Sequence, residues 1–180
     1  MTRRIATRTT LVTLGLATLA ACIVNLSFAM DKPQVALKSN AGTTKIAEQT
    51  ILVDLGEYKE ITEHKHNIKS LDLDFVDVTI TAVGSGNTAA TVTGNVTLRK
   101  NLMDPVANDI AVGALSAVPL TVGQTRRING TPTLDAFLLQ QLQNAGKFYV
   151  VVSGSIDHGV ADVTVDLNLH ASIGYDAGIF

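Results

Sequence analysis

The sequence predicts a mainly β protein: an antiparallel β-sandwich, immunoglobulin-like or of a related Greek-key type, with one or two short helices. Three observations predict this fold class. From Thr50 onward apolar and polar residues alternate over long runs, β-branched residues are frequent in these runs, and turn-forming residues separate them. The 180 residues, 46% of them apolar, suffice for one domain with a substantial core.

The alternation is clearest in three runs, residues 91–98, 147–156 and 161–175. The last run would span about 50 Å at about 3.3 Å per residue, which is long for a straight strand in a small domain. We therefore expect it to bend or to pass between sheets near residues 171–174. Six to eight strands are expected in all.

Two turns indicate hairpins. The segment Gly84–Asn87 would join a strand over 76–83 to one over 89–99, and Asp157–Gly159 would join the last two runs.

The strand over residues 71–82 contains a change of phase. Its apolar residues lie at odd positions up to Phe75 and at even positions from Val76 onward. A slip of one residue turns every later side chain to the other face. The pattern therefore predicts a β-bulge, or a switch between sheets, at Phe75–Val76.

Two segments have helical spacing. The stronger one opens at Thr131-Pro132-Thr133 and ends at Gly146. Its apolar stripe consists of Leu134, Phe137, Leu138, Leu142 and Ala145. Its water-facing side is predicted to hold Gln140, Gln141, Gln143 and Asn144. A weaker helix is predicted over residues 57–67.

The N-terminus has the composition of an export signal. Arg3 and Arg4 precede an apolar stretch over residues 11–21, and the first acidic residue is Asp31. A positively charged start followed by a short apolar core is typical of a signal peptide. We therefore set residues 1–21 apart from the fold.

The four residues Leu19-Ala20-Ala21-Cys22 follow this apolar core. They resemble the lipobox of bacterial lipoproteins. The resemblance implies that Leu19, Ala20 and Ala21 are recognised by the signal peptidase and that Cys22 becomes the lipidated first residue of the mature chain. It implies a protein held at the outer membrane, facing the periplasm or the cell surface. Two or three acyl chains would hold it stably.

An alternative export site is Ser27-Phe28-Ala29, which has small residues at the positions that an ordinary signal peptidase requires. Cleavage there would release a soluble protein beginning at Met30. Residues 22–48 are predicted to form the lipidated N-terminus and a flexible tether, because residues 30–47 show no sustained periodicity. The single β-sandwich domain is then predicted over residues 49–180.

Composition excludes several classes of function. Without residues 1–21, which hold three basic residues and no acid, the net charge falls from −2 to −5, unlike that of a nucleic-acid-binding domain. A single cysteine excludes an internal disulfide and a cysteine-rich zinc site. No phosphate loop, dinucleotide fingerprint, nucleophile elbow or zinc-protease motif occurs. We therefore expect that the protein is not an enzyme and that it binds no cofactor.

Metal binding is not expected either. The candidate ligands are Asp72, Asp74 and Asp77, which flank the change of phase and could converge at a bulge. Charged residues on an exposed sheet face are explained equally well by protection against aggregation. The four histidines are expected to be solvated.

The sequence therefore predicts a lipid-anchored, non-catalytic protein of the cell envelope with a binding or structural role. Its partners would be the membrane, through the lipid on Cys22, and a protein or a second copy reached through sheet edges, the acidic face or the loops of residues 100–130. The alternative is the soluble secreted subunit cleaved after Ala29, which would self-assemble through strand edges.

Overall fold

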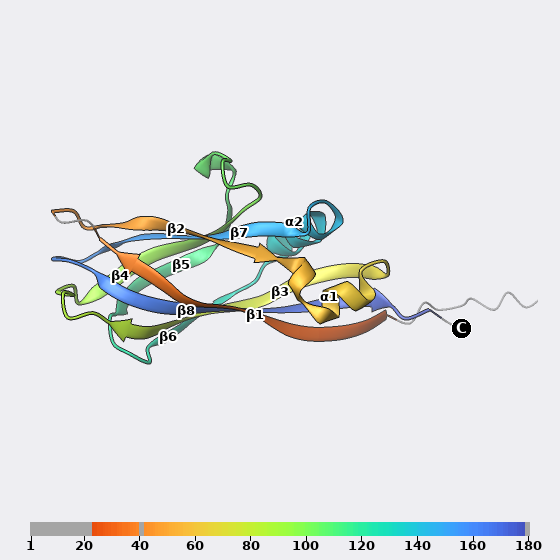
Figure 1. The fold of residues 1–180 in the computed structure, drawn as a ribbon, viewed down its shortest axis with the longest axis horizontal. Helices are drawn as coiled ribbons and strands as arrows, with labels where there is room; N and C mark the ends of the chain where they lie inside the picture. The colour runs from red at the N-terminus through yellow and green to blue at the C-terminus, as the bar shows by residue number, and fades with distance from the viewer. Residues whose placement is uncertain (1–22, 40–41, 179–180) are drawn as a thin grey trace, which may run out of the picture.

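Two four-stranded antiparallel sheets face each other in the computed structural model, which describes residues 23–39 and 42–178 (Figure 1). Sheet A contains, in spatial order, β1 (Ile23–Lys38), β8 (Asp162–Asp176), β3 (Ile68–Val83) and β6 (Thr125–Asn129). Sheet B contains β2 (Lys45–Asp54), β7 (Lys147–Ile156), β4 (Thr91–Arg99) and β5 (Ile110–Pro119). The predicted mainly β, antiparallel sandwich is confirmed.

The core lies between the sheets, because alternate residues of every strand point inward. Burial alternates without a break along β8 from Val163 to Ile173, which is the pattern of a strand with one buried face. The largest fully buried side chains of the strands include Met30, Leu98, Phe148, Leu167 and Leu169.

The strand order is that of an eight-stranded jelly roll rather than an immunoglobulin domain. Along the chain, β1, β3, β6 and β8 lie in sheet A, whereas β2, β4, β5 and β7 lie in sheet B. Two sheets built from interleaved strands in this order form the jelly-roll variant of the Greek key. Among the strands of the described residues, β4 and β5 are the only consecutive ones that pair with each other.

The two predicted hairpins are wrong, because the strands that each turn connects do not pair with each other. The turn at Gly84–Asn87 connects β3 to β4, and Asp157–Gly159 connects β7 to β8, but each turn carries the chain from one sheet to the other. Turn residues favour chain reversal, and they do not specify which strand edge the chain meets next.

The predicted tether is also wrong, because residues 23–38 form β1 and pair with β8 along almost their whole length. The fold accordingly includes residues 23–38, which the prediction had left outside a domain over residues 49–180. A bulge after Lys32 explains why periodicity failed here. Gln34 has a φ of 60°, and the buried face moves from Met30 to Val35 and Leu37, which differ from Met30 in parity.

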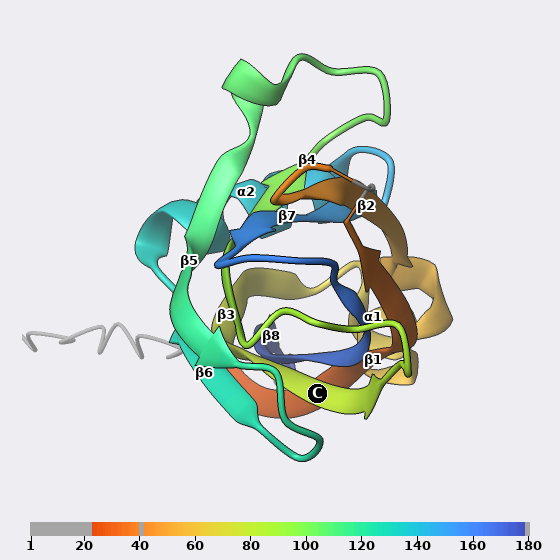
Figure 2. The same ribbon diagram turned by 90° about the vertical axis from the view of Figure 1, so that its left-hand side faces the viewer.

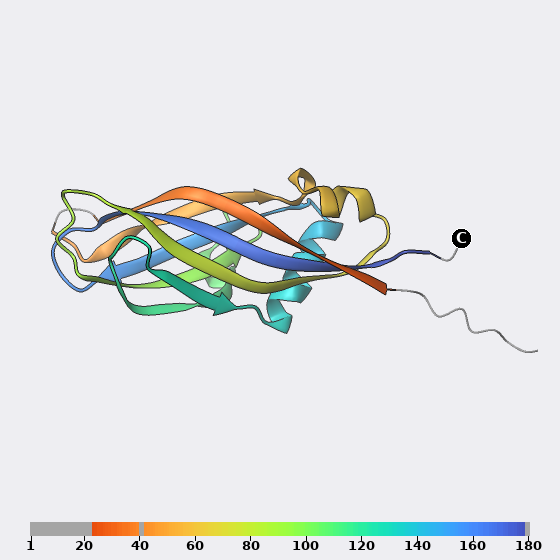
Figure 3. The same ribbon diagram turned by 90° about the horizontal axis from the view of Figure 1, so that it is seen from below.

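The predicted phase change in β3 is confirmed. The register against β8 shifts between Leu73 and Phe75, which leaves Asp74 as the extra residue of a bulge. Of the two alternatives predicted for residues 161–175, a bend or a passage between sheets, the passage does not occur. This run, β8, stays between β1 and β3 throughout and accommodates its length by twisting (Figure 3).

Helices cover the end of the sandwich where β1 begins (Figure 1). The weaker predicted helix is shorter than expected and consists of a 3₁₀ turn, η1 (Leu55–Glu57), followed by α1 (Lys59–His64). The stronger one is α2 (Pro132–Gln143), with Pro132 in its first turn as predicted.

One prediction for α2 is wrong. Gln141 does not face water: it is 1% exposed, and neither its amide nitrogen nor its oxygen has a hydrogen-bond partner within the described residues. A buried amide without a partner destabilises the fold by about 1–3 kcal/mol. The helical pattern predicted Gln141 on the water-facing side because glutamine rarely occupies a fully buried position.

Candidate functional site

The loop between β4 and β5, residues 100–109, projects away from the sandwich on the side of sheet B (Figure 2). It carries three exposed apolar side chains, since Leu102, Met103 and Val106 are 52%, 90% and 66% exposed. Clustered exposed apolar side chains are typical of interaction sites, and an unbranched methionine adapts readily to the shape of a partner. We refer to these three residues as the apolar tip.

A buried ion pair holds the base of this loop. Arg99, the last residue of β4, donates from Nε and Nη2 to the two carboxylate oxygens of Asp109, at 2.7 and 2.8 Å. The two side chains are 6% and 5% exposed. Because the bidentate geometry fixes both planar groups, the pair clamps the two ends of the loop together.

Two further residues complete this clamp. Arg99 also donates from Nη1 to Glu48 on β2, at 2.9 Å, and the Thr97 hydroxyl donates to Asp109, at 3.1 Å. The hydrogen bonds from Arg99 hold the pKa of Asp109 below its usual value, with a smaller contribution from Thr97. The hydrogen bonds to Asp109 and Glu48 raise the pKa of Arg99 further. Both groups of the pair are therefore charged at neutral pH.

The loop is also ordered internally. Asn101 donates its backbone N–H to Asp104, at 3.0 Å, and the Asp104 N–H returns a bond to the Asn101 carbonyl, at 3.0 Å. A 3₁₀ turn, η2 (Val106–Asn108), follows. The apolar tip is thus presented by a structured loop, and Val106 forms one wall of a groove on the outer face of sheet B.

The three predicted carboxylates do not converge. Ser70 donates to Asp72, Ser172 donates to Asp74, and Asp77 is bound by Arg127. Nowhere in residues 23–39 and 42–178 do three histidine, cysteine, aspartate or glutamate side chains gather as a metal site would require. The bulge in β3 turns Phe75 outward instead of bringing these aspartates together.

The outward Phe75 lies in a stack that was not predicted from the sequence. The Arg127 guanidinium lies 3.5 Å from the Phe75 ring centroid on one side, and the His170 ring is stacked at 4.2 Å. Arg127 also donates twice to Asp77, at 2.8 and 2.7 Å, which holds the pKa of Asp77 low. Through these contacts Arg127, which lies on β6, stabilises the outer face of sheet A.

The other histidines lie in separate surroundings. His64 stacks on Tyr175 at 3.8 Å, His66 is exposed in the turn after α1, and His158 lies 3.1 Å from Asp157 in the turn before β8. The three histidines therefore lie in three different parts of the described fold.

The predicted anchor residues lie outside the described residues. This applies to Cys22 and to the recognition residues Leu19, Ala20 and Ala21. The helices of the described part of the chain include none that is long and apolar enough to span a membrane.

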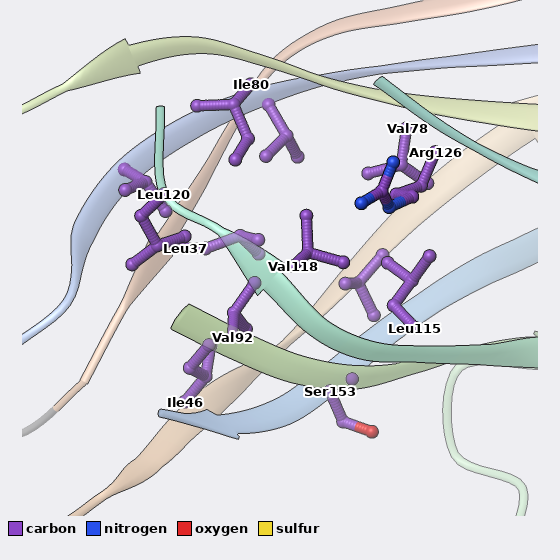
Figure 4. A pocket seen from close by; sticks show the side chains of 14 residues that line it. Leu37, Ile46, Val78, Ile80, Val92, Leu115, Val118, Leu120, Arg126 and Ser153 are labelled. Carbon is purple, nitrogen blue, oxygen red and sulfur yellow. The ribbon is translucent and has the colours of Figure 1, made fainter. Parts of the chain in front are cut away.

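An apolar cavity lies between the sheets beside β5 and β6 (Figure 4). Its volume is about 30 Å³, close to that of one water molecule. Sites for small organic ligands usually measure about 300–1,000 Å³, so this space is a gap in the core packing. Labelled lining residues are Leu37, Ile46, Val78, Ile80, Val92, Leu115, Val118, Leu120, Arg126 and Ser153.

Comparison with known proteins yields structural neighbours alone. No family model matches the chain, and no curated protein matches it. Among solved structures it is similar to the decameric BFDV capsid protein (12% identity, TM-score 0.41, 83% of this chain and 99% of that chain). It is also similar to the structure of turnip yellow mosaic virus (10% identity, TM-score 0.38, 99% of this chain and 93% of that chain). A third similar structure is that of Cocksfoot mottle virus (11% identity, TM-score 0.40, 99% of this chain and 96% of that chain). No statement about function follows from similarity at this level.

Proposed function

We propose that the protein is an exported β-sandwich of the cell envelope, anchored to a membrane by lipid on Cys22, that binds a protein partner and catalyses no reaction. The observation that carries the binding role is the apolar tip, because its side chains are exposed while the base of their loop is fixed by the buried Arg99–Asp109 pair. A structured loop loses little conformational freedom on binding, which favours affinity.

The composition of the loop indicates the chemistry of the partner. Asp104 is engaged with Asn101 inside the loop, and Asp109 is engaged with Arg99 at its base. Asp109 is therefore already paired with a cation inside the fold, and Asp104 is held by N–H groups of Asn101. The proposed partner therefore offers an apolar pocket rather than a strongly charged surface.

The position of β1 supports anchoring at Cys22. The described fold uses the chain from Ile23 onward, and Ile23 already pairs with Asp176 of β8. Cleavage before Cys22 would leave every described residue in place. Cleavage after Ala29 would remove the first seven residues of β1.

Metabolic labelling tests the anchor. Cells that express the full chain with a clickable fatty acid should yield labelled, membrane-associated protein, and Cys22→Ala should abolish the label, because Cys22 is the only thiol available for acylation. Ser27→Ala is the control and should retain it. An unlabelled wild-type protein recovered in the soluble fraction would refute the anchor.

Site-specific photo-crosslinking tests the binding loop. A photoreactive amino acid at Met103 should give one protein adduct in intact cells. Val106→Asp should reduce its yield about tenfold, since burying one aliphatic side chain is worth about 1.5–3 kcal/mol. Val122, which is 60% exposed in another turn, is the control position. Equal adducts from positions 103 and 122 would contradict a specific contact.

Self-association through a strand edge is the second candidate. The Ile23–Met30 half of β1 has no charged side chain, and no other strand of the described residues pairs with its outer edge. This observation favours strand pairing between copies, which a Ser27→Lys change should abolish in a light-scattering mass measurement. Cleavage after Ala29 would remove this same edge, so the secreted form beginning at Met30 could not use it.

A further inference from the structure

The apolar tip stands beside a groove on the outer face of sheet B. Val106 forms one wall of this groove, which has a volume of about 530 Å³. Val151 also lines it, and this side chain is 2% exposed although it lies outside the core between the sheets. Ala111 and Ala114 of β5 line the groove as well and are exposed. The same face therefore carries an apolar projection and, next to it, an apolar recess.

Sheet B carries no net charge around this groove. Its strands and Asp109 together hold three basic and three acidic residues. The two charged residues that line the groove, Glu48 and Asp109, are both bound by Arg99. Lys147, at the start of β7, is paired with Asp54 at 2.9 Å. Two copies of this face can therefore meet without net electrostatic repulsion.

Sheet A is less suited to contact between copies. Its strands hold seven acidic and five basic residues. Four of its aspartates make no ion pair with any other described residue: Asp31, Asp72, Asp74 and Asp166. Two outer faces of sheet A would repel each other, because like charges would come to lie opposite one another.

We propose that the partner of the apolar tip is a second copy of this chain, whose groove on sheet B receives the tip. The inference rests on the binding role proposed above for the tip. Figure 2 shows the loop that carries the tip standing off sheet B, and the groove lies directly beside it because Val106 belongs to both. A twofold axis between tip and groove then places the tip of each copy in the groove of the other.

This arrangement makes the same contact twice. Met103 and Val106 of each copy become buried against Val151 of the other, and the Arg99–Asp109 pair keeps both loops in the shape that they need for binding. The acidic outer faces of sheet A point away from each other. The dimer therefore buries the apolar surface of the tips and keeps the charged faces in water.

Sedimentation velocity tests the dimer. The chain from Cys22 is the mature protein of the proposed function and contains every described residue, and a reducing agent keeps its single cysteine from forming a disulfide. We expect a reversible monomer–dimer equilibrium. Val106→Asp should raise its dissociation constant about a hundredfold, because each buried valine contributes about tenfold and the contact occurs twice. Val122→Asp, in another exposed turn, and Ser27→Lys, on the edge of β1, should leave it unchanged.

Complementary variants test the contact between tip and groove directly. Ala114→Lys should also prevent self-association, because it places an ammonium group where the tip of the other copy docks. A mixture of Val106→Asp and Ala114→Lys chains should restore the dimer as a heterodimer. In it the introduced carboxylate faces the introduced ammonium in one contact, while the second contact is that of the wild type. Restoration also shows that both variants are folded.

Three results would overturn the proposal: a wild-type chain that stays monomeric at millimolar concentration, a dimer that Val106→Asp leaves intact, and complementary variants that do not combine. A dimer lost in Ser27→Lys alone would favour pairing through the edge of β1. The crosslink at Met103 distinguishes failure of this inference from failure of the proposed function. An adduct with a different polypeptide would refute the dimer and retain the binding role, whereas an adduct of twice the mass of the chain supports both.

Discussion

Replacing Arg99 by methionine is expected to lower the melting temperature by on the order of 10 °C, because it leaves the carboxylate of Asp109 buried without its partner. Asp109 is 5% exposed and receives two of its hydrogen bonds from this guanidinium. Methionine keeps much of the aliphatic volume, so loss of the ion pair rather than a cavity accounts for the change. Differential scanning calorimetry measures the effect.

A matched control is available in the same fold. Arg127 also makes a bidentate pair, with Asp77, but its side chain is 54% exposed. Arg127→Met should therefore shift the melting temperature by about 3 °C or less, as expected for a solvent-exposed pair. Equal shifts for the two variants would show that burial does not determine the strength of the clamp.

The destabilisation caused by Arg99→Met is expected to decrease as the pH falls. In the wild type the lowered pKa of Asp109 means that the pair stabilises the fold above the unfolded-state pKa, and this stabilisation is lost as pH falls through the lower, folded-state pKa. Without Arg99, burial raises the pKa of Asp109, so acidification relieves the penalty. The difference in melting temperature between the wild type and Arg99→Met should therefore become smaller as the pH is lowered from neutral to about 4.

A chain that begins at Met30 is expected to be less stable than one that begins at Cys22 by about 3–5 kcal/mol or more. It lacks seven residues that pair with β8, including Phe28, which is 8% exposed and lies 5.7 Å from the Tyr58 ring. Loss of one large buried aromatic side chain alone costs about 3–5 kcal/mol. Urea unfolding followed by far-UV circular dichroism gives the two free energies.

A Phe28→Ala substitution in the chain from Cys22 separates the ring from the strand. We expect this variant to lie between the two chains, because it keeps the backbone pairing while losing the aromatic ring. If the chain from Met30 proved as stable as the chain from Cys22, export with cleavage after Ala29 would become the better hypothesis.

Local pattern predicted the sheets well, because one buried face imposes a period of two. Residues 161–175 show this most clearly, and the odd-to-even change around Phe75 located a real bulge. Strand β1 could not be predicted in this way, because the Pro33–Gln34 bulge interrupts its alternation and its first half continues the apolar composition of the predicted export signal.

Other features could not be predicted from local sequence patterns, because they depend on contacts between segments that are distant in the sequence. The turns at Gly84 and Gly159 were identified, but the pairing of β3 with β8 and of β4 with β7 is decided across the whole domain. The apolar tip lies in a segment without periodicity. Its signal was the presence of Leu102, Met103 and Val106 in a stretch with turn-forming residues, which by itself does not separate a buried loop from an exposed one.

The central position of β8 determines when the molecule can assemble. This strand, the last of the described fold, lies between β1 and β3, so sheet A lacks its middle until the ribosome has synthesised residues 162–176. Pairing strands so far apart in the sequence is a slow, non-local step. Sheet A is therefore incomplete while the earlier strands are being synthesised, a state compatible with the export proposed above.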